Sequence, residues 1–330
     1  MRGRSLLRAV LLGHEPWSLR TVRDWPEPVL GPGQVLVRIS GVGICGSDLA
    51  LADGRRRVPG YPWVPGHEAF GEVVATADGA DRGLAGRRVV IEPNYPCLHC
   101  PACQAGQTSL CPDRAVVGFT VPGLLADYAA VPEAYAWPLP DNWTEGDAVC
   151  AEPLTVALAA IRRRGDLAPG SRCLVIGAGS QGMLMCLALV ARGINPHVLE
   201  PAEGRRDLAV SLGAIAAAAG DDGFGTVFET SGSPAALAEA LTRAAPGATI
   251  MLIGLSGQPA LTDTELIVRR QLSLRGSIIY DHPGDFAATL RIAGVPAGAV
   301  LRASYPLEEA AAAFRAAGTL AGKTWIRLGH

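Results

Sequence analysis

The pattern of apolar and polar positions changes character near residue 150. Before that point, short β-like runs are broken by Gly and Pro, as expected for strands joined by turns. The clearest runs are QVLVRIS (34–40), AFGEVVAT (69–76), RRVVIEP (87–93) and DYAAVPE (127–133). Their spacing predicts a partly barrel-like antiparallel domain over residues 1–150.

After residue 150, strand-like and helix-like segments alternate. A helical pattern over 151–167 is interpreted as a bridge from the first domain. The apolar strand-like segments that follow it are 173–177, 196–200, 226–232, 248–254 and 272–279, and the helical segments between them are 180–193, 202–213 and 233–245. Such alternation predicts a parallel, doubly wound sheet in a second domain over 151–297, so the fold class is α/β. A strand–helix–strand segment over 298–330 is expected to return to the first domain.

Length and charge narrow the class of protein. A chain of 330 residues suits two domains of roughly 150 residues each. A formal net charge of −2 argues against nucleic-acid binding, because such proteins usually carry a clear basic excess.

The N-terminal run is apolar without being a targeting signal. Arg8 interrupts it and no small-residue cleavage site follows, so we interpret it as a first strand with Arg8 on the solvent side. No run approaches the ~20 apolar residues of a membrane helix. The sequence predicts a cytoplasmic protein without a membrane partner.

The segment GAGSQG fits the pattern G-x-G-x-x-G. Its residues are Gly177, Ala178, Gly179, Ser180, Gln181 and Gly182. Alone the pattern is weak in a chain with 40 glycines, but here it directly follows a strand and opens a helix. Gly177 permits the tight turn, Gly179 lets a pyrophosphate approach the backbone and Gly182 allows helix and strand to pack closely. The helix N-terminus then offers free N–H groups to phosphates.

The choice of nucleotide depends on Glu200, at the end of the next strand. A carboxylate there accepts hydrogen bonds from ribose hydroxyls and repels a 2′-phosphate, which favours NAD over NADP. Arg205 and Arg206 favour the opposite choice, since a guanidinium can bind a phosphate. The blander interpretation is an exposed helix face for both arginines.

Half of the eight cysteines are crowded into fifteen residues. They are Cys97, Cys100, Cys103 and Cys111. Four thiolates so close in sequence can surround one tetrahedral Zn²⁺ and leave no open coordination position, so this zinc is expected to be structural. The alternatives are two disulfides or a DNA-binding zinc ribbon. Ribbons usually have a longer spacer between cysteine pairs, and a reducing compartment disfavours disulfides.

A second set of ligands is more scattered. Cys45, His67 and Glu68 offer one S, one N and one O ligand, and Glu152 adds a second carboxylate. Catalytic zinc keeps three protein ligands and an open position. For a single Cys or His, ordinary packing would be a better explanation than metal binding. For a whole set of such residues, in a chain with a structural-zinc loop and a nucleotide fold, metal binding is the better explanation.

The segments GICGSD, GHE, the four-cysteine loop, AEPL and GAGSQG occur in an order that resembles one known family. The chain is similar to zinc-dependent medium-chain dehydrogenases/reductases of the alcohol dehydrogenase superfamily. GHE with EPL resembles the polyol branch, which contains sorbitol, threonine and butanediol dehydrogenases. Some aminocyclitol dehydrogenases carry the same motifs.

The resemblance implies a GroES-like β-rich catalytic domain with a structural-zinc lobe at about 92–112, a Rossmann domain, and an active site in the cleft between them. It makes Cys45, His67 and one or both of Glu68 and Glu152 the catalytic zinc ligands. Ser47 would relay the substrate proton, and Asp48 would hold the second nitrogen of His67. Relatives are usually homodimers or homotetramers.

Two departures from the family's pattern stand out. In AIAAAAGDDGFGTVFE (214–229), only about eight residues separate a short third strand of the second domain from the strand-like segment that follows it, whereas a crossover usually needs a dozen or more. One family helix is therefore expected to be lost or reduced to a loop. In addition, GLLADY replaces a Gly-rich stretch often seen before the family's Tyr, which weakens transfer of the substrate by analogy.

The expected reaction is reversible oxidation of a secondary alcohol of a polyol, cyclitol or amino-alcohol, with hydride transfer to NAD. One thiolate, one carboxylate and an imidazole make the zinc centre neutral, and a second carboxylate weakens its pull on the substrate oxygen. We therefore hypothesise that Glu68 and Glu152 do not both bind during the chemical step. The alternatives are a non-catalytic nucleotide sensor or scaffold and a zinc-free enone reductase.

The loop over 51–63 joins two zinc-ligand segments and carries Arg55, Arg56 and Arg57 in succession. A solvated turn is the blander interpretation. The sharper one is that a guanidinium reaches an anionic or heavily hydroxylated substrate, because Arg presents a fork of donors.

Overall fold

The computed structural model describes residues 7–255, 257–292 and 294–329. Contacts within the chain divide it into two compact units. The first runs as far as Glu152 and resumes at Leu301, and the second is Pro153–Val300. The first division falls inside helix α4 (Ala151–Arg164), where the sequence pattern changes from strand-like to helical.

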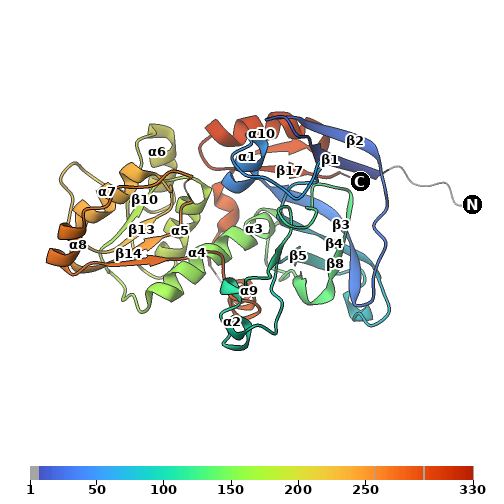
Figure 1. The fold of residues 1–330 in the computed structure, drawn as a ribbon, viewed down its shortest axis with the longest axis horizontal. Coiled ribbons are helices and arrows are strands. Elements are labelled where there is room, and N and C mark those ends of the chain that lie inside the picture. The colour runs from blue at the N-terminus through green and yellow to red at the C-terminus, as the bar shows by residue number, and fades with distance from the viewer. Residues whose placement is uncertain (1–6, 256, 293, 330) are drawn as a thin grey trace, which may run out of the picture. The chain divides into compact units, whose positions relative to one another are not determined.

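The first unit is built on a seven-stranded, mostly antiparallel sheet (Figure 1). In spatial order the strands are β16 (Leu301–Pro306), β17 (Lys323–Arg327), β3 (Gln34–Gly43), β4 (Glu68–Thr76), β5 (Arg88–Ile91) and β9 (Ala136–Pro138), with β8 (Tyr128–Pro132) on β3. The four runs predicted as strands before residue 150 are confirmed as β3, β4, β5 and β8. The C-terminal segment completes this sheet, because β17 pairs antiparallel with β3.

Smaller elements flank the sheet of the first unit. They are the antiparallel pairs β1 (Leu7–Leu12) with β2 (Leu19–Trp25) and β6 (Asn94–Tyr95) with β7 (Ala115–Val116), and the helices α1 (Gly46–Ala52), α2 (Pro101–Gln104), α3 (Glu145–Val149) and α10 (Ala310–Thr319). The core combines residues distant in sequence: Val37 of β3, Leu125, Phe314 of α10 and Ile326 of β17 are all buried in one cluster. Burying these large apolar side chains supplies the main driving force for closing the unit.

Leu125 belongs to the GLLADY segment, which therefore contributes to this core. Its Asp127 is buried and pairs with Arg8, with Nη2 of Arg8 2.8 Å from Oδ1 of Asp127. The predicted first strand is confirmed as β1, and Arg8 is its one residue that is not buried, although acidic partners hold its side chain. The Arg8 side chain is only 20% exposed and also contacts Glu308 at 3.1 Å. A buried carboxylate is costly without a partner of opposite charge, so Asp127 holds Arg8 against the unit.

The second unit is a six-stranded parallel sheet, and helices join all of its consecutive strands except β12 and β13 (Figure 1). Its strands, in spatial order, are β12 (Ile215–Ala216), β11 (His197–Leu199), β10 (Cys173–Ile176), β13 (Phe224–Glu229), β14 (Ala244–Leu252) and β15 (Ser273–Gly276). Its helices after α4 are α5 (Ser180–Val190), α6 (Glu203–Ser211), α7 (Pro234–Arg243), α8 (Thr264–Arg270) and α9 (Gly284–Arg291). The strand order reverses between β10 and β13, which is the doubly wound topology that the sequence predicts.

The connection from β12 to β13 confirms the expected loss of a crossover helix. Residues 217–223 join the two strands as turns and irregular backbone. Helices α8 and α9 were not predicted from the pattern. Helix α8 is short and none of its residues is fully buried, although Leu266 and Ile267 pack against the core of the second unit.

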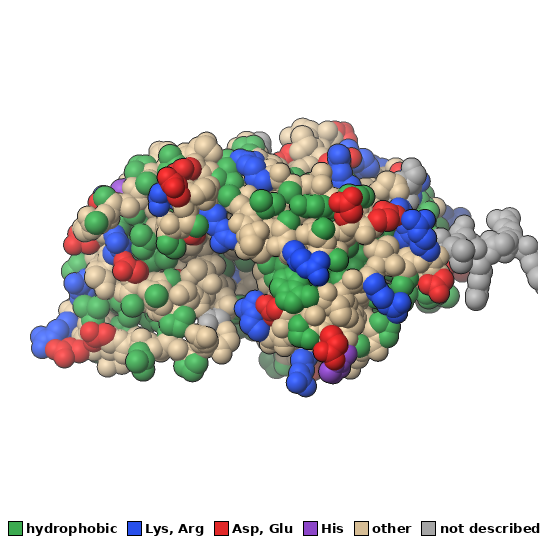
Figure 2. Space-filling model, turned by 90° about the horizontal axis from the view of Figure 1, so that it is seen from above, with side chains coloured by type: hydrophobic (Ala, Val, Ile, Leu, Met, Phe, Trp, Pro, Cys, Tyr) green, Lys and Arg blue, Asp and Glu red, His purple; other side chains and the backbone are tan. Residues whose placement is uncertain are grey.

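The surface shows mixed charge. On the face drawn in Figure 2, Lys and Arg side chains are interspersed with Asp and Glu, in keeping with the net charge of −2. Among the residues that the structure describes, no helix is both long enough and apolar enough to cross a bilayer.

Candidate active site and metal centres

The turn into helix α1 positions the first group of candidate ligands. Cys45 is the N-cap of α1, and its backbone N–H donates to Oδ2 of Asp48 at 2.9 Å. Asp48 is the third residue of α1, a position from which a carboxylate can accept a hydrogen bond from the backbone N–H of the N-cap residue. The Ser47 hydroxyl donates to Sγ of Cys45 at 3.2 Å. The segment CGSD therefore folds so that its thiol, hydroxyl and carboxylate are held close together.

His67 reaches the same place from the start of strand β4. The preceding Gly66 has φ +93°, a left-handed conformation that favours glycine, and it turns the chain into the strand. Nδ1 of His67 lies 3.3 Å from Oδ1 of Asp48. Asp48 thus uses one oxygen on the α1 cap and the other on the imidazole. This leaves Nε2 of His67 as the nitrogen available to a metal ion.

Cys45, His67 and Glu68, here called the Cys45 cluster, each offer one ligand atom, and these atoms lie within 4.8 Å of one another. Glu152, which the sequence offers as a second carboxylate beside Glu68, is buried and is not part of this group. The three donors are a sulfur, an imidazole nitrogen and a carboxylate oxygen, which is a set that zinc accepts. The residues present therefore fit a zinc ion with an open coordination position.

Electrostatics around the Cys45 cluster favour a protonated His67 beside an ionised Asp48. Burial opposes the charged form of His67, but the Asp48 carboxylate and the Cys45 sulfur raise its pKa well above the ordinary value. Burial likewise opposes ionisation of Asp48, while His67 and the Cys45 backbone amide hold its pKa below the usual range. A metal ion at Nε2 has to displace the proton that these neighbours stabilise.

Lys323 is a member of this site that the sequence analysis missed. It is 1% exposed, pairs with Oε2 of Glu68 and donates from Nζ to the Ile44 carbonyl at 3.1 Å. The Glu68 charge raises the pKa of Lys323 despite burial. A Cβ at Gly43 would lie 2.7 Å from Cε of Lys323, so a glycine there leaves room for the pair. No motif marked this lysine, because its partner lies hundreds of residues away.

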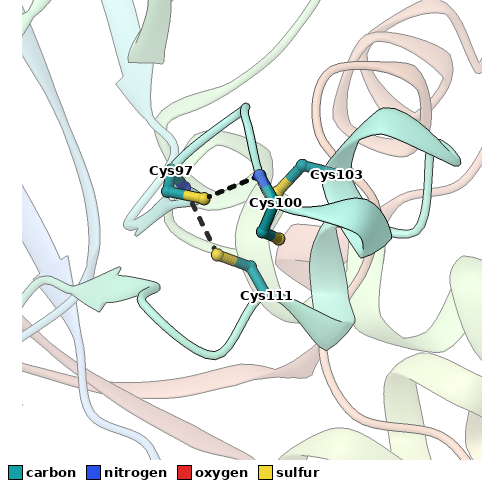
Figure 3. Close-up of side chains that lie close together, drawn as sticks. All are labelled: Cys97, Cys100, Cys103 and Cys111. Atoms are coloured by element: carbon teal, nitrogen blue, oxygen red, sulfur yellow. Dashed lines mark hydrogen bonds between the residues drawn. The ribbon is translucent and has the colours of Figure 1, made fainter.

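The second metal centre is the four-cysteine lobe, residues 97–111, around helix α2 (Figure 3). The four sulfurs lie within 4.8 Å of one another, and all four cysteines are free. Two backbone amides point at sulfur: Cys97 N–H donates to Sγ of Cys111 at 3.3 Å, and Cys100 N–H to Sγ of Cys97 at 3.4 Å. Tetrahedral zinc with bonds of about 2.3 Å needs sulfurs about 3.8 Å apart, so the lobe fits that ion.

Charge within the lobe also calls for a cation. The backbone amides of His99 and Cys100 lower the pKa of Cys97 to about 6. Removal from water and contact with Cys100 raise the pKa of Cys103 to about 12. A bound divalent cation would favour the thiolate form of all four neighbouring sulfurs. The buried Cys150 and Cys186 differ, because burial raises the pKa of each to about 12 and keeps it a thiol.

The glycine turn of the second unit connects β10 to α5. Gly177 has φ +90°, and a Cβ on Gly182 would collide with the Gly177 carbonyl oxygen. Nothing lies within 4 Å of a Cβ built on Gly179, the N-cap of α5. Gln181, in the first turn, donates from Nε2 to the Pro153 carbonyl at 3.2 Å. The backbone of this turn therefore stays open to a phosphate beside Gly179.

Glu200 lies against this turn. Its Oε2 accepts from the Ala178 N–H at 2.7 Å and its Oε1 from the Ala202 N–H at 2.9 Å. A carboxylate has about four acceptor positions, so two remain for hydroxyl donors. Arg205 stands in the first turn of α6, next to Arg206, which donates to the Glu200 carbonyl at 3.4 Å. The residues of the turn and Glu200 thus fit a nucleotide.

Two family models match the chain. Residues 31–141 match the alcohol dehydrogenase GroES-like domain, and residues 182–293 match the zinc-binding dehydrogenase domain. The chain belongs to the zinc-binding alcohol dehydrogenase family. The expected GroES-like and Rossmann domains are confirmed, and the protein is an oxidoreductase of the alcohol and polyol type.

Curated relatives place it in the polyol branch. Sorbitol dehydrogenase of Bacillus subtilis is 31% identical over 74% of this chain and 76% of its own length. L-threonine 3-dehydrogenase of Pyrococcus furiosus is 32% identical over 77% of each chain. These relatives support a small-molecule alcohol as the substrate of the present chain.

Solved structures agree with the fold. The alcohol dehydrogenase RspB from Escherichia coli CFT073, complexed with NADH, matches with a TM-score of 0.88 and 25% identity over 97% of this chain and 99% of that one. A zinc-binding dehydrogenase from Sinorhizobium meliloti bound to NADP matches with a TM-score of 0.87 and 26% identity over 98% and 99%. Family and structures together support zinc and a nicotinamide nucleotide as cofactors.

Proposed function

We propose that the protein is a zinc-dependent dehydrogenase that reversibly oxidises a secondary alcohol of a polyol, cyclitol or amino-alcohol to a ketone and transfers the hydride to NAD. The observation that carries this proposal is the Cys45 cluster, oriented by Asp48, in a chain that also has the open glycine turn at Gly179. We further propose a homodimer or homotetramer in the cytoplasm.

Cys45, His67 and Glu68 would hold the catalytic zinc. Bound there, zinc supplies a Lewis acid that lowers the pKa of the substrate hydroxyl and stabilises negative charge on its oxygen. Asp48 keeps the imidazole in the orientation that presents Nε2. The Ser47 hydroxyl, beside Sγ of Cys45, takes the proton that leaves the substrate and passes it toward solvent.

Glu68 and Glu152 do not both bind zinc during the chemical step in this proposal. Glu68 already has a cationic partner in Lys323, which offsets part of its charge. A second carboxylate would lower the net charge of the centre and weaken its attraction for a developing oxyanion. Structures in several ligand states with both glutamates bound throughout would contradict this point.

The four cysteines of the lobe would hold a second, structural zinc, so each chain carries two ions. Gly177, Gly179 and Gly182, with Ser180 and Gln181 in the first turn of α5, would hold the pyrophosphate of the nucleotide. Bound there, the nicotinamide supplies the acceptor for the hydride. Glu200 would hold the ribose hydroxyls and so favour NAD.

The Glu200→Ser variant tests the choice of nucleotide. Loss of a charged acceptor should lower kcat/KM for NAD by about 10- to 100-fold, since hydrogen bonds to charged groups contribute about 1.5–3 kcal/mol. The preference should move toward NADP, because the repulsion of a 2′-phosphate disappears. The matched control is Glu203→Ser in the exposed first turn of α6, which should change neither value. Wild-type protein that already prefers NADP would overturn the assignment.

The proposed function itself is tested with a panel of polyols, cyclitols and amino-alcohols, followed by NADH absorbance. The best member should exceed 2-propanol in kcat/KM by at least ~100-fold, because a polar site rejects substrates that leave its groups unpaired. Activity should vanish on chelation and return with zinc. Equal rates on 2-propanol contradict the polyol assignment. Turnover of no alcohol supports a sensor, and metal-independent reduction of an enone supports an enone reductase.

A further inference from the structure

The three arginines after helix α1 differ in their surroundings. Arg55 is engaged by its own loop, with Nη2 2.6 Å from Oδ2 of Asp53. Arg56 is exposed, and its backbone N–H donates to the Ala50 carbonyl at 2.8 Å. Among the residues that the structure describes, no carboxylate pairs with the Arg56 guanidinium, whose contact is the face of the Phe119 ring. Its Cζ lies 4.1 Å from the ring centroid.

Phe119 joins Arg56 to the Cys45 cluster. The Phe119 ring is 5% exposed, and its centroid lies 5.0 Å from that of the His67 imidazole in an edge-on arrangement. One phenyl ring therefore separates the Arg56 guanidinium from a candidate zinc ligand. This places a positive charge close to the Cys45 cluster.

Stacking holds the guanidinium without using its donors. A cation–π contact engages the flat face of the group, while the N–H donors point outward in its plane. Those donors form a fork that matches a carboxylate or a phosphate in bidentate geometry. Because Arg56 is exposed, its N–H groups can be reached by a ligand.

The charges that act on Arg56 are consistent with a position close to the Cys45 cluster. Partial removal from water lowers the pKa of Arg56, and the charges of Asp48 and Cys45 oppose that change. The guanidinium thus lies close enough to the Cys45 cluster to interact with its charges. Arg55 instead has its charge offset by Asp53.

We propose that Arg56 binds an anionic group of the substrate, a carboxylate or a phosphate ester, so that the natural substrate is an anionic polyol or hydroxy acid. The inference rests on the proposed function, because it takes the reacting hydroxyl to lie at the Cys45 cluster. Phe119 acts as the spacer that sets the distance between the anionic group and the reacting carbon.

The test compares wild type with Arg56→Gln on matched sets of ligands, each a hexitol with its aldonate and its hexitol phosphate of the same configuration. Two quantities are measured: kcat/KM from NADH absorbance, and Kd by calorimetry without nucleotide. Wild type should prefer an anionic member in both. Arg56→Gln should weaken that member by about 10- to 100-fold, as expected for charge-assisted hydrogen bonds, and change the hexitols less than twofold. If Arg56→Gln weakens the aldonate, the bound anionic group is a carboxylate; if it weakens the hexitol phosphate, the group is a phosphate ester.

The matched control is Arg57→Gln, which removes the same charge one residue away and should leave all values nearly unchanged. Arg56→Lys keeps the charge without the fork and should fall between wild type and Arg56→Gln. Equal weakening of neutral and anionic ligands, or tightest binding of a hexitol by wild type, overturns the proposal. Anion binding that depends on Arg56 without turnover of any ligand would leave the Arg56 assignment standing and refute the proposed function.

Discussion

Replacement of Cys45 by alanine is expected to lower kcat/KM by about 1000-fold or more while the chain stays folded. Cys45 offers the only thiol of its cluster, and its sulfur contacts the Ser47 hydroxyl. Without it the site loses an anionic ligand and holds zinc weakly. A metal Lewis acid contributes several kcal/mol to transition-state stabilisation, and each 1.4 kcal/mol is tenfold in rate. Steady-state kinetics, zinc content and thermal unfolding together measure the effect.

The control for Cys45→Ala is Cys186→Ala, which removes a thiol that is buried in α5 and joins neither candidate metal group. This variant should keep its zinc and most of its activity. Cys45→Ala protein that turns over at the wild-type rate with one zinc ion fewer would show that the Cys45 cluster is not the catalytic centre. Loss of folding in Cys45→Ala would contradict the assignment as well.

Replacement of Cys100 by alanine is expected to act on stability instead. Cys100 is the N-cap of α2, and its backbone N–H donates to Sγ of Cys97. The fold of the lobe and the arrangement of its metal ligands therefore depend on each other. Loss of a structural metal is among the few causes of destabilisation of about 4 kcal/mol or more. The variant should lose one zinc ion, unfold at lower urea concentration and be cleaved by protease within 97–111. The fraction that stays folded should keep catalysing.

The matched control for this variant is Gln104→Ala, an exposed position on the same short helix, which should keep wild-type stability and zinc content. The two cysteine variants also test each other. If Cys45→Ala unfolds the chain and Cys100→Ala gives a stable, inactive protein, the catalytic and structural assignments are exchanged.

Local patterns in the sequence were enough to predict much of the architecture. Alternating apolar positions marked β3, β4, β5 and β8, because a strand that buries a face repeats every two residues. The shortness of the segment before β13 predicted that a crossover helix is lost or reduced to a loop, since a crossover usually needs more residues than are present. The four cysteines and the glycine turn were visible for the same reason: their members are close in sequence and their spacing reflects the geometry of the ligand.

The same patterns carry less information about contacts between residues that are distant in sequence. Arg8 was expected to face solvent as a charged residue in an apolar strand, yet Asp127 draws it against the unit. The sequence also named Glu152 together with Glu68, because both fit the motif of the family. Only three-dimensional distances separate Glu68, which joins Cys45 and His67, from Glu152, which does not.

The sequence by itself thus determined the α/β class, the sulfur-rich lobe, the glycine turn and the residues that could bind a metal. The tertiary structure decided which of them meet. Lys323 pairs with Glu68 and binds the Ile44 carbonyl across 279 positions of the chain, and Phe119 inserts between Arg56 and His67. These contacts depend on how the strands of the sheet pair and on how the loops pack, and both are set by the chain that lies between the contacting residues. A short segment cannot encode them, because burial and charge pairing are properties of the whole folded unit.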